Sequence, residues 1–167
     1  MTAYHLPEGS YVRRFTTRLL VLHHTLGPAD QTIEAIRAFH TRPKSEDGRG
    51  WNDIGYHFLV RQGEVHVGRP VWAVGAHAAG RLPTGQVVGC NGLSIGIALV
   101  GTYSDASPPG PEQMDALCSL VTDLRARYHE SDLRVVDHRT AMAELGLPGH
   151  TTCPGLDLAA RVLARLP

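Results

Sequence analysis

The sequence predicts an α/β fold, a single domain with a mixed central β-sheet flanked by helices. Largely apolar runs at residues 19–22 and 94–100 are typical of strands that are buried on both faces of a sheet. Between and after these runs, apolar residues recur at helical spacing. The length of 167 residues suits one domain with a core of its own.

The first half of the chain reads as strand, helix, loop and hairpin. A strand at 19–24 is followed by a break at Gly27 and Pro28, and then by a short amphipathic helix. Asp30 or Thr32 caps this helix, which ends near residue 41. The charged stretch 42–50 is expected to be a solvated loop. Strands at 56–60 and 64–67 flank Gln62-Gly63, a pair typical of a tight hairpin turn.

The second half adds a buried strand, two helices and a last short strand. The segment 75–91 is expected to be loop, and it leads into the strand at 94–100. The prolines at 108–111 then mark the start of a helix with an apolar stripe that reaches Tyr128. A strand at 133–137 delivers His138 at its end, and a final helix covers 156–166. Catalytic groups are expected at the strand ends and in the loops.

Composition excludes several classes of partner. The 16 basic and 16 acidic residues are interspersed, which argues against a nucleic-acid footprint. The apolar run at 19–22 is too short for a signal-peptide core or a membrane span, so no signal peptide and no self-encoded export are expected. Three cysteines without a paired framework or a CxxC motif fit reduced thiols in a cytoplasm.

Three residues stand out as potential metal ligands: His23, His138 and Cys153. Two imidazoles and one thiolate leave one of the four tetrahedral positions of zinc open for water, as catalytic zinc sites do. His23 and His24 are adjacent on a predicted strand, where side chains alternate between the two faces. Only one of the two can therefore serve a given site, and the other is structural.

Five blocks of sequence resemble the type 2 N-acetylmuramoyl-L-alanine amidases, a family that includes phage lysozyme-like endolysins and animal peptidoglycan recognition proteins. They occur in one order between residues 19 and 158: Val21–Thr25, Trp51–Phe58, Val74–His77, Asn91–Ile97, and Asp137–Arg139 through Thr151–Gly155. The resemblance implies a zinc amidase catalytic domain at 19–167, preceded by an N-terminal extension at 1–18. The implied fold places the zinc site at strand ends.

The resemblance also assigns roles to individual residues. It implies that His23, His138 and Cys153 bind Zn²⁺, with His24 as a structural neighbour. Tyr56 matches the position of a catalytic tyrosine, although β-propensity alone would explain a tyrosine in a strand. Thr151 matches a position that holds lysine in some phage members. Its hydroxyl can donate one hydrogen bond to a developing oxyanion but supplies no positive charge.

Trp51, His77 and Asn91 lie in the matching blocks and are candidates for contact with the sugar and peptide of the substrate. Trp51 could equally be a core aromatic residue, and Asn91 could simply form a turn. The stretch 141–149 is longer than its counterpart in compact phage relatives and ends before His150. This loop either shapes the substrate groove or is a tolerated surface insertion.

The function that the resemblance implies is hydrolysis of the amide bond between N-acetylmuramic acid and L-alanine in bacterial peptidoglycan. A monomeric, lytic phage-type endolysin is expected, held in the cytoplasm of the producing cell until it is released to the wall. A cytoplasmic amidase that recycles soluble muropeptides has the same chemistry. A non-catalytic peptidoglycan-binding module is disfavoured because the chain keeps the ligand set together with Tyr56. A structural zinc domain would need a fourth protein ligand.

Overall fold

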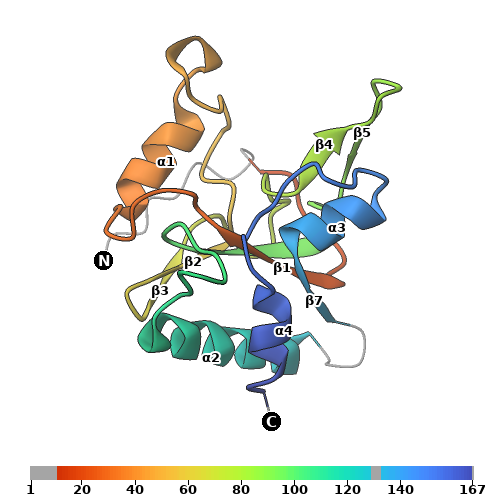
Figure 1. Ribbon diagram of the computed structural model, residues 1–167. Coiled ribbons are helices and arrows are strands. Elements are labelled where there is room, and N and C mark those ends of the chain that lie inside the picture. Colours follow the sequence, from red (N-terminus) through yellow and green to blue (C-terminus); the bar gives the residue numbers. More distant parts are fainter. Residues whose placement is uncertain (1–10, 129–132, 167) are drawn as a thin grey trace.

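A five-stranded mixed sheet lies at the centre of the computed structural model, which describes residues 11–128 and 133–166 (Figure 1). Its strands are β1 (Leu19–His24), β2 (Phe58–Arg61), β3 (Glu64–Val67), β6 (Ser94–Leu99) and β7 (Arg134–Asp137). They are ordered β3-β2-β6-β1-β7, and only β3 runs antiparallel to its neighbour. The predicted α/β fold with a mixed central sheet is therefore confirmed.

Helices α2 (Pro111–Arg127) and α4 (Leu158–Leu163) cover one face of this sheet. Alternate residues of β1, Leu20 and Leu22, point toward them into the largest apolar cluster. The predicted stripe on α2 supplies the facing side chains, which include Met114 and Leu117. Because side chains alternate along a strand, Val21 and His23 point to the opposite face. The strand alternation thus directs His23 away from the main core.

The opposite face carries α1 (Ile33–Thr41), α3 (His138–Glu144) and a hairpin of β4 (Ala79–Arg81) and β5 (Val87–Gly89). In Figure 1, α1 and this hairpin rise from the same side of the sheet and stand apart from each other. Helix α1 begins after Thr32, whose hydroxyl oxygen accepts a hydrogen bond from the Ala35 amide at 3.1 Å. A single helical turn, η1 (Lys44–Glu46), lies in the predicted loop at 42–50.

Two further predicted loops contain regular structure. The segment 75–91 includes the β4–β5 hairpin, and the stretch expected to be a loop at 141–149 begins as the second half of α3. Burial explains both differences: Met142 of α3 packs against Ala78 and Cys90, at the two ends of the hairpin segment. The remaining differences are at element ends, since β2 begins at Phe58 and the last helix covers only Leu158–Leu163.

The described part of the predicted N-terminal extension, residues 11–18, lies against the domain. The amide of Arg14 donates to the Trp72 carbonyl at 2.7 Å, and the amide of Val74 donates to the Val12 carbonyl at 2.8 Å. The Arg14 guanidinium is buried and donates to the Val71 carbonyl. Residues 1–10 lie outside the described residues. A domain boundary at residue 18 stays a prediction.

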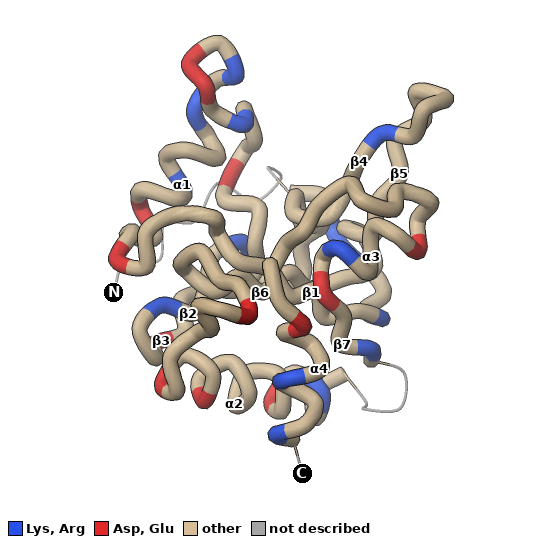
Figure 2. The backbone as a smooth tube through the Cα atoms, in the orientation of Figure 1, with Lys and Arg blue, Asp and Glu red and all other residues tan. Residues whose placement is uncertain are grey.

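Charges of both signs are dispersed over the elements, as Figure 2 shows along α1, α2 and the loop that follows α1. This distribution matches the interspersed pattern of the sequence. Within residues 11–128 and 133–166, no helix is long and apolar enough to cross a membrane.

Candidate metal centre and active site

The sheet brings the three candidate metal ligands together. His23 lies near the end of β1, and His138 directly follows β7, the parallel neighbour of β1. Because Leu22 pairs with Asp137 in that ladder, the next residue of each strand lies at the same edge of the sheet. Cys153 arrives from the loop before α4. One ligand atom of each residue lies within 4.8 Å of the others.

The side chains fit a zinc ion. The Nε2 atom of His138 is buried without a hydrogen-bond partner among the described residues, and His23 Nδ1 lies 3.8 Å from the Cys153 sulfur. Two imidazole nitrogens and one sulfur form a donor set that zinc prefers, with one coordination position left over. The arrangement therefore provides a site for a metal that also has room for water or substrate.

Burial sets the protonation states in this centre. It lowers the pKa of His138 to about 4, and burial together with the adjacent histidines lowers the pKa of His23 well below its ordinary value. Both rings are thus neutral and offer a lone pair, which metal binding requires. Burial also raises the pKa of the Cys153 thiol to about 12. A divalent cation would reverse that effect, because a coordinated thiol loses its proton.

His24 points away from the metal ligands. Its ring nitrogen Nδ1 accepts a hydrogen bond from the Tyr103 amide at 3.1 Å. Its backbone amide donates to the Cys153 sulfur at 3.4 Å. His24 therefore anchors the loop after β6 and supports Cys153 through the backbone, which agrees with the structural role expected for one of the two adjacent histidines.

Tyr56 and Thr151 stand beside the ligands. The ring of Tyr56 is centred 5.2 Å from that of His23, and burial raises the pKa of its hydroxyl. The hydroxyl therefore stays protonated and able to donate at neutral pH. Thr151 uses its oxygen to accept from the Cys153 amide at 3.1 Å, which leaves its own O–H group available as a donor.

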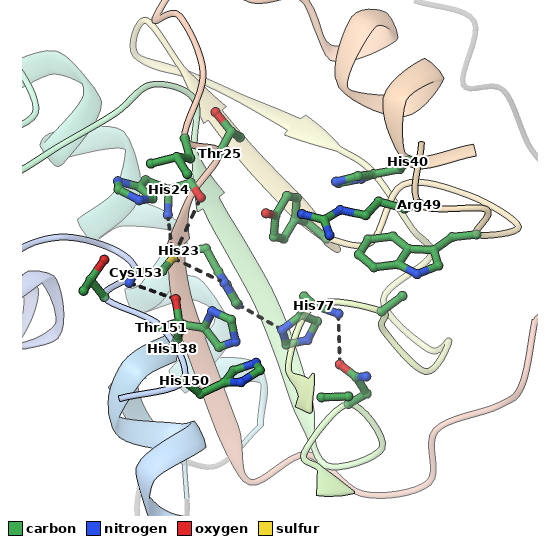
Figure 3. A pocket seen from close by; sticks show the side chains of 17 residues that line it. His23, His24, Thr25, His40, Arg49, His77, His138, His150, Thr151 and Cys153 are labelled. Atoms are coloured by element: carbon green, nitrogen blue, oxygen red, sulfur yellow. Dashed lines mark hydrogen bonds between the residues drawn. The ribbon is translucent and has the colours of Figure 1, made fainter. Parts of the chain in front are cut away.

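These residues surround a cavity of about 390 Å³ (Figure 3). One wall comes from α1 and the following loop, with His40, Arg49 and Trp51. The other wall comes from Ala79 on the β4–β5 hairpin and from His150, which follows α3. Residues of the centre form the floor. The cavity therefore holds the three metal ligands together with Tyr56 and Thr151.

The three predicted substrate contacts have different surroundings. Trp51 stands on the cavity wall with its ring centred 4.8 Å from that of His40. His77 is buried at 7% exposure, and its Nδ1 lies 3.0 Å from His23 Nε2. The amide oxygen of Asn91 accepts from the backbone of His77 and Ala78 at 3.0 and 2.8 Å. Contact of the three with substrate stays a prediction.

Residues 13–156 match the family model described as N-acetylmuramoyl-L-alanine amidase. The chain belongs to this amidase family. The amidase is 34% identical to the endolysin of Enterobacteria phage T3 over 87% of its own length and 85% of that protein. Identity to the endolysin of Escherichia phage T7 is 32%, over 89% and 87% of the two chains. These relatives support a phage-type peptidoglycan amidase function and confirm the predicted resemblance.

Solved structures agree with this membership. The Ph2119 endolysin from a Thermus scotoductus bacteriophage superimposes with a TM-score of 0.68 at 34% identity, covering 89% of the amidase and 84% of that chain. The bumblebee peptidoglycan recognition protein SA gives a TM-score of 0.70 at 24% identity over 96% and 90% of the chains, which shows a shared fold alone.

Sequence reasoning did not single out several residues of the amidase's site. His40 and Arg49 belong to α1 and its loop, which carry no recognisable chemical motif, and they join the cavity only through the tertiary fold. Ser94 is fully buried, and its hydroxyl lies 3.2 Å from His77 Nε2. A signal for Ser94 was present, because it is a polar residue at the start of an otherwise apolar central strand.

Proposed function

We propose that this amidase uses zinc to hydrolyse the amide bond between the lactyl group of N-acetylmuramic acid and L-alanine in bacterial peptidoglycan, as a lytic endolysin. The observation that carries the proposal is the clustering of His23, His138 and Cys153 within 4.8 Å at the floor of an open cavity that also holds Tyr56. Membership of the amidase family supports the bond between N-acetylmuramic acid and L-alanine as the bond that is cleaved.

The residues would share the work as follows. His23, His138 and Cys153 would hold the zinc ion, and the neutral imidazoles need lose no proton to do so. When bound, zinc supplies Lewis-acid chemistry, since it lowers the pKa of a coordinated water and polarises a carbonyl. The Tyr56 hydroxyl keeps its proton and donates a hydrogen bond to the oxyanion that develops on the substrate carbonyl.

Thr151 would supply a second, weaker hydrogen bond to the same oxyanion. In its contact with the Cys153 amide the Thr151 oxygen is the acceptor. The Thr151 proton is not used in that hydrogen bond and can be donated to the oxyanion. A neutral hydroxyl stabilises a negative charge less than a lysine ammonium would. Trp51 would offer its flat apolar face on the cavity wall to a sugar ring or a stem-peptide side chain.

The test is release of fragments from purified cell walls, followed by turbidity and by mass analysis of the soluble products. The expected result is loss of turbidity with stem peptides that carry a free L-alanine amino terminus, inhibition by a chelator and recovery with added zinc. His23→Ala should abolish release. His66→Ala removes a histidine from β3, outside the cavity, and should leave release unchanged.

Other outcomes would replace the proposal. Cleavage of soluble muropeptides but not of intact walls would indicate a recycling amidase. Binding to walls without cleavage, even with added zinc, would indicate a recognition module. The proposal also includes a monomer that stays in the cytoplasm of the producing cell until its release to the wall, and that has residues 19–167 as its catalytic domain. Light scattering of the purified protein tests the monomer.

A further inference from the structure

We propose that His77 is a positioning residue for the metal centre: together with Ser94 it fixes the proton of His23 on Nε2, so that His23 presents Nδ1 to the metal. This inference rests on the proposed function in taking zinc as the metal. It assigns His77 a role behind the ligands, whereas the sequence alone suggests contact with substrate.

The chain of hydrogen bonds starts at a backbone carbonyl. The Ser94 hydroxyl lies 2.8 Å from the Cys90 carbonyl oxygen and 3.2 Å from His77 Nε2. A carbonyl can only accept, so the single proton of the hydroxyl points to Cys90. The Ser94 oxygen must then accept from His77, which places the proton of the His77 ring on Nε2 and a lone pair on Nδ1.

The same reasoning carries over to His23. His77 Nδ1 lies 3.0 Å from His23 Nε2, and two lone pairs at that distance would repel each other. His23 must therefore donate its Nε2 proton to His77. Its lone pair then lies on Nδ1, the atom that faces the Cys153 sulfur at 3.8 Å. Figure 3 shows His23 between Cys153 and His77 in this arrangement.

The surroundings of His77 hold its ring in place. A Cβ atom at Gly96 would lie 2.5 Å from the His77 ring, and one at Gly75 would lie 2.4 Å from it, closer than real contacts allow. Two glycines thus leave the slot that the ring fills. Asn91 fixes the backbone at the same point, since its amide oxygen accepts from the amides of His77 and Ala78. A ring that is held on several sides and only 7% exposed suits positioning better than substrate contact.

The geometry also explains why a buried histidine pair is useful here. A histidine ligand needs its lone pair aimed at the metal, and the partner of its other nitrogen decides which nitrogen that is. Most proteins use a carboxylate or a carbonyl as this partner. Here the Cys90 carbonyl orients the Ser94 hydroxyl, the hydroxyl orients the neutral His77 ring, and that ring sets the tautomer of His23. Because all three groups are neutral, they add no charge to the buried centre.

The first experiment reads the proton positions directly in the metal-free protein at neutral pH. Two-bond ¹H–¹⁵N spectra of the imidazole rings distinguish protonated from unprotonated nitrogens. We expect His23 and His77 both to carry the proton on Nε2, and Ser94→Ala to shift His77 toward a mixture of the two tautomers. A proton on Nδ1 of either ring in the wild-type protein would overturn the inference.

The second experiment measures zinc affinity by competition with a chelator. His77→Leu removes the acceptor for His23 and should weaken zinc binding by about 10–100-fold. His77→Asn places an amide oxygen where Nδ1 was and should restore affinity to within a few-fold of the wild-type value. Unfolding midpoints of both variants show whether each is folded. Wild-type affinity in a folded His77→Leu variant, or equal losses in both variants, would refute the positioning role.

Kinetics separate this role from substrate contact, since a substrate contact predicts a raised KM at saturating zinc with unchanged zinc affinity. The same measurements distinguish an error in the role of His77 from an error in the choice of metal. If the wild-type protein cleaves walls with zinc but its rings carry the other tautomers, only the role of His77 is wrong. If the wild-type protein binds no zinc while the tautomers are as expected, the metal assignment of the proposed function is wrong.

Discussion

Substituting Gly96 with alanine tests the slot around His77 by geometry alone. Apolar carbon atoms in contact are about 3.5–4.0 Å apart, whereas the new Cβ would lie 2.5 Å from the ring. The ring must therefore retreat by roughly 1 Å. Gly75 also lies against this ring, since a Cβ there would be 2.4 Å from His77 Cδ2. A shift of this size disturbs the hydrogen bond between His77 Nδ1 and His23 Nε2, which are 3.0 Å apart.

The expected cost follows from two opposing effects. Overpacking a buried site costs about 1–3 kcal/mol. Replacing glycine in the middle of a strand recovers about 0.5–1 kcal/mol of conformational entropy. The net loss is about 0–2.5 kcal/mol, which for a chain of this length lowers Tm by up to about 10 °C. Zinc affinity should fall about tenfold or more, because the ligand loses its partner.

Thermal unfolding and chelator competition measure the two effects. Gly92→Ala is the control, since nothing lies within 4 Å of a Cβ at that position. It should leave zinc affinity unchanged and should not lower Tm, because the loss of backbone entropy in the unfolded chain can only raise it slightly. In a His77→Ala background the clash is gone, so Gly96→Ala should no longer destabilise the protein. The reasoning is refuted if Gly96→Ala retains wild-type stability and zinc affinity, or if its cost persists without the His77 ring.

Three further predictions concern other parts of the molecule. Tyr56→Phe should lower kcat by about 10²–10³-fold with zinc affinity unchanged, as for loss of one oxyanion donor; single-turnover release of stem peptide within tenfold of wild type would contradict this. The neutral ring of His40, with its pKa lowered from 6.5 to about 4 mainly by burial, contributes stability that is full above about pH 6.5 and lost as the pH falls toward 4, because only the unfolded chain then binds the proton. The His40→Asn variant keeps an acceptor for the Gly55 amide but does not titrate. Its free energy of unfolding in urea should therefore vary less with pH than that of the wild type, and an identical pH dependence would contradict this prediction. A chain that begins at residue 19 loses the hydrogen bonds of residues 11–18, each worth about 1 kcal/mol; we expect a clearly lower urea midpoint, and an unchanged one would mean that residues 1–18 are a separable extension.

Two strands could be predicted from the sequence because they are buried on both faces of the sheet and therefore consist of continuous, largely apolar runs. The strand predicted at 19–24 matches β1, and the one predicted at 94–100 matches β6 to within a residue. The ends of α1 were also close, because Thr32 supplies a cap that acts through local chemistry. The short elements α3 and β4–β5 were not predicted. They are stabilised by contacts between Met142 and the hairpin segment, and local sequence does not record such tertiary packing.

The candidate metal ligands could be predicted from the sequence, whereas the residues that support them could not. The resemblance named His23, His138 and Cys153, and the structure brings them together. The link between His77 and its partners lay beyond sequence reasoning. His23 and His77 are 54 positions apart and His77 and Ser94 are 17 apart. Their contact depends on the register that places Val21 of β1 beside Gly96 of β6. Only the folded sheet shows that the glycine makes room for a ring.

The two walls of the cavity come from excursions that leave the sheet and return to it, one through α1 and one through the β4–β5 hairpin. The metal ligands instead lie on β1, directly after β7 and in the loop before α4. Segments of the first kind can change length or be exchanged between relatives at small entropic cost. Exchanging the hairpin at residues 79–89 between relatives would therefore change one wall of the cavity and leave the three metal ligands on the elements that now carry them.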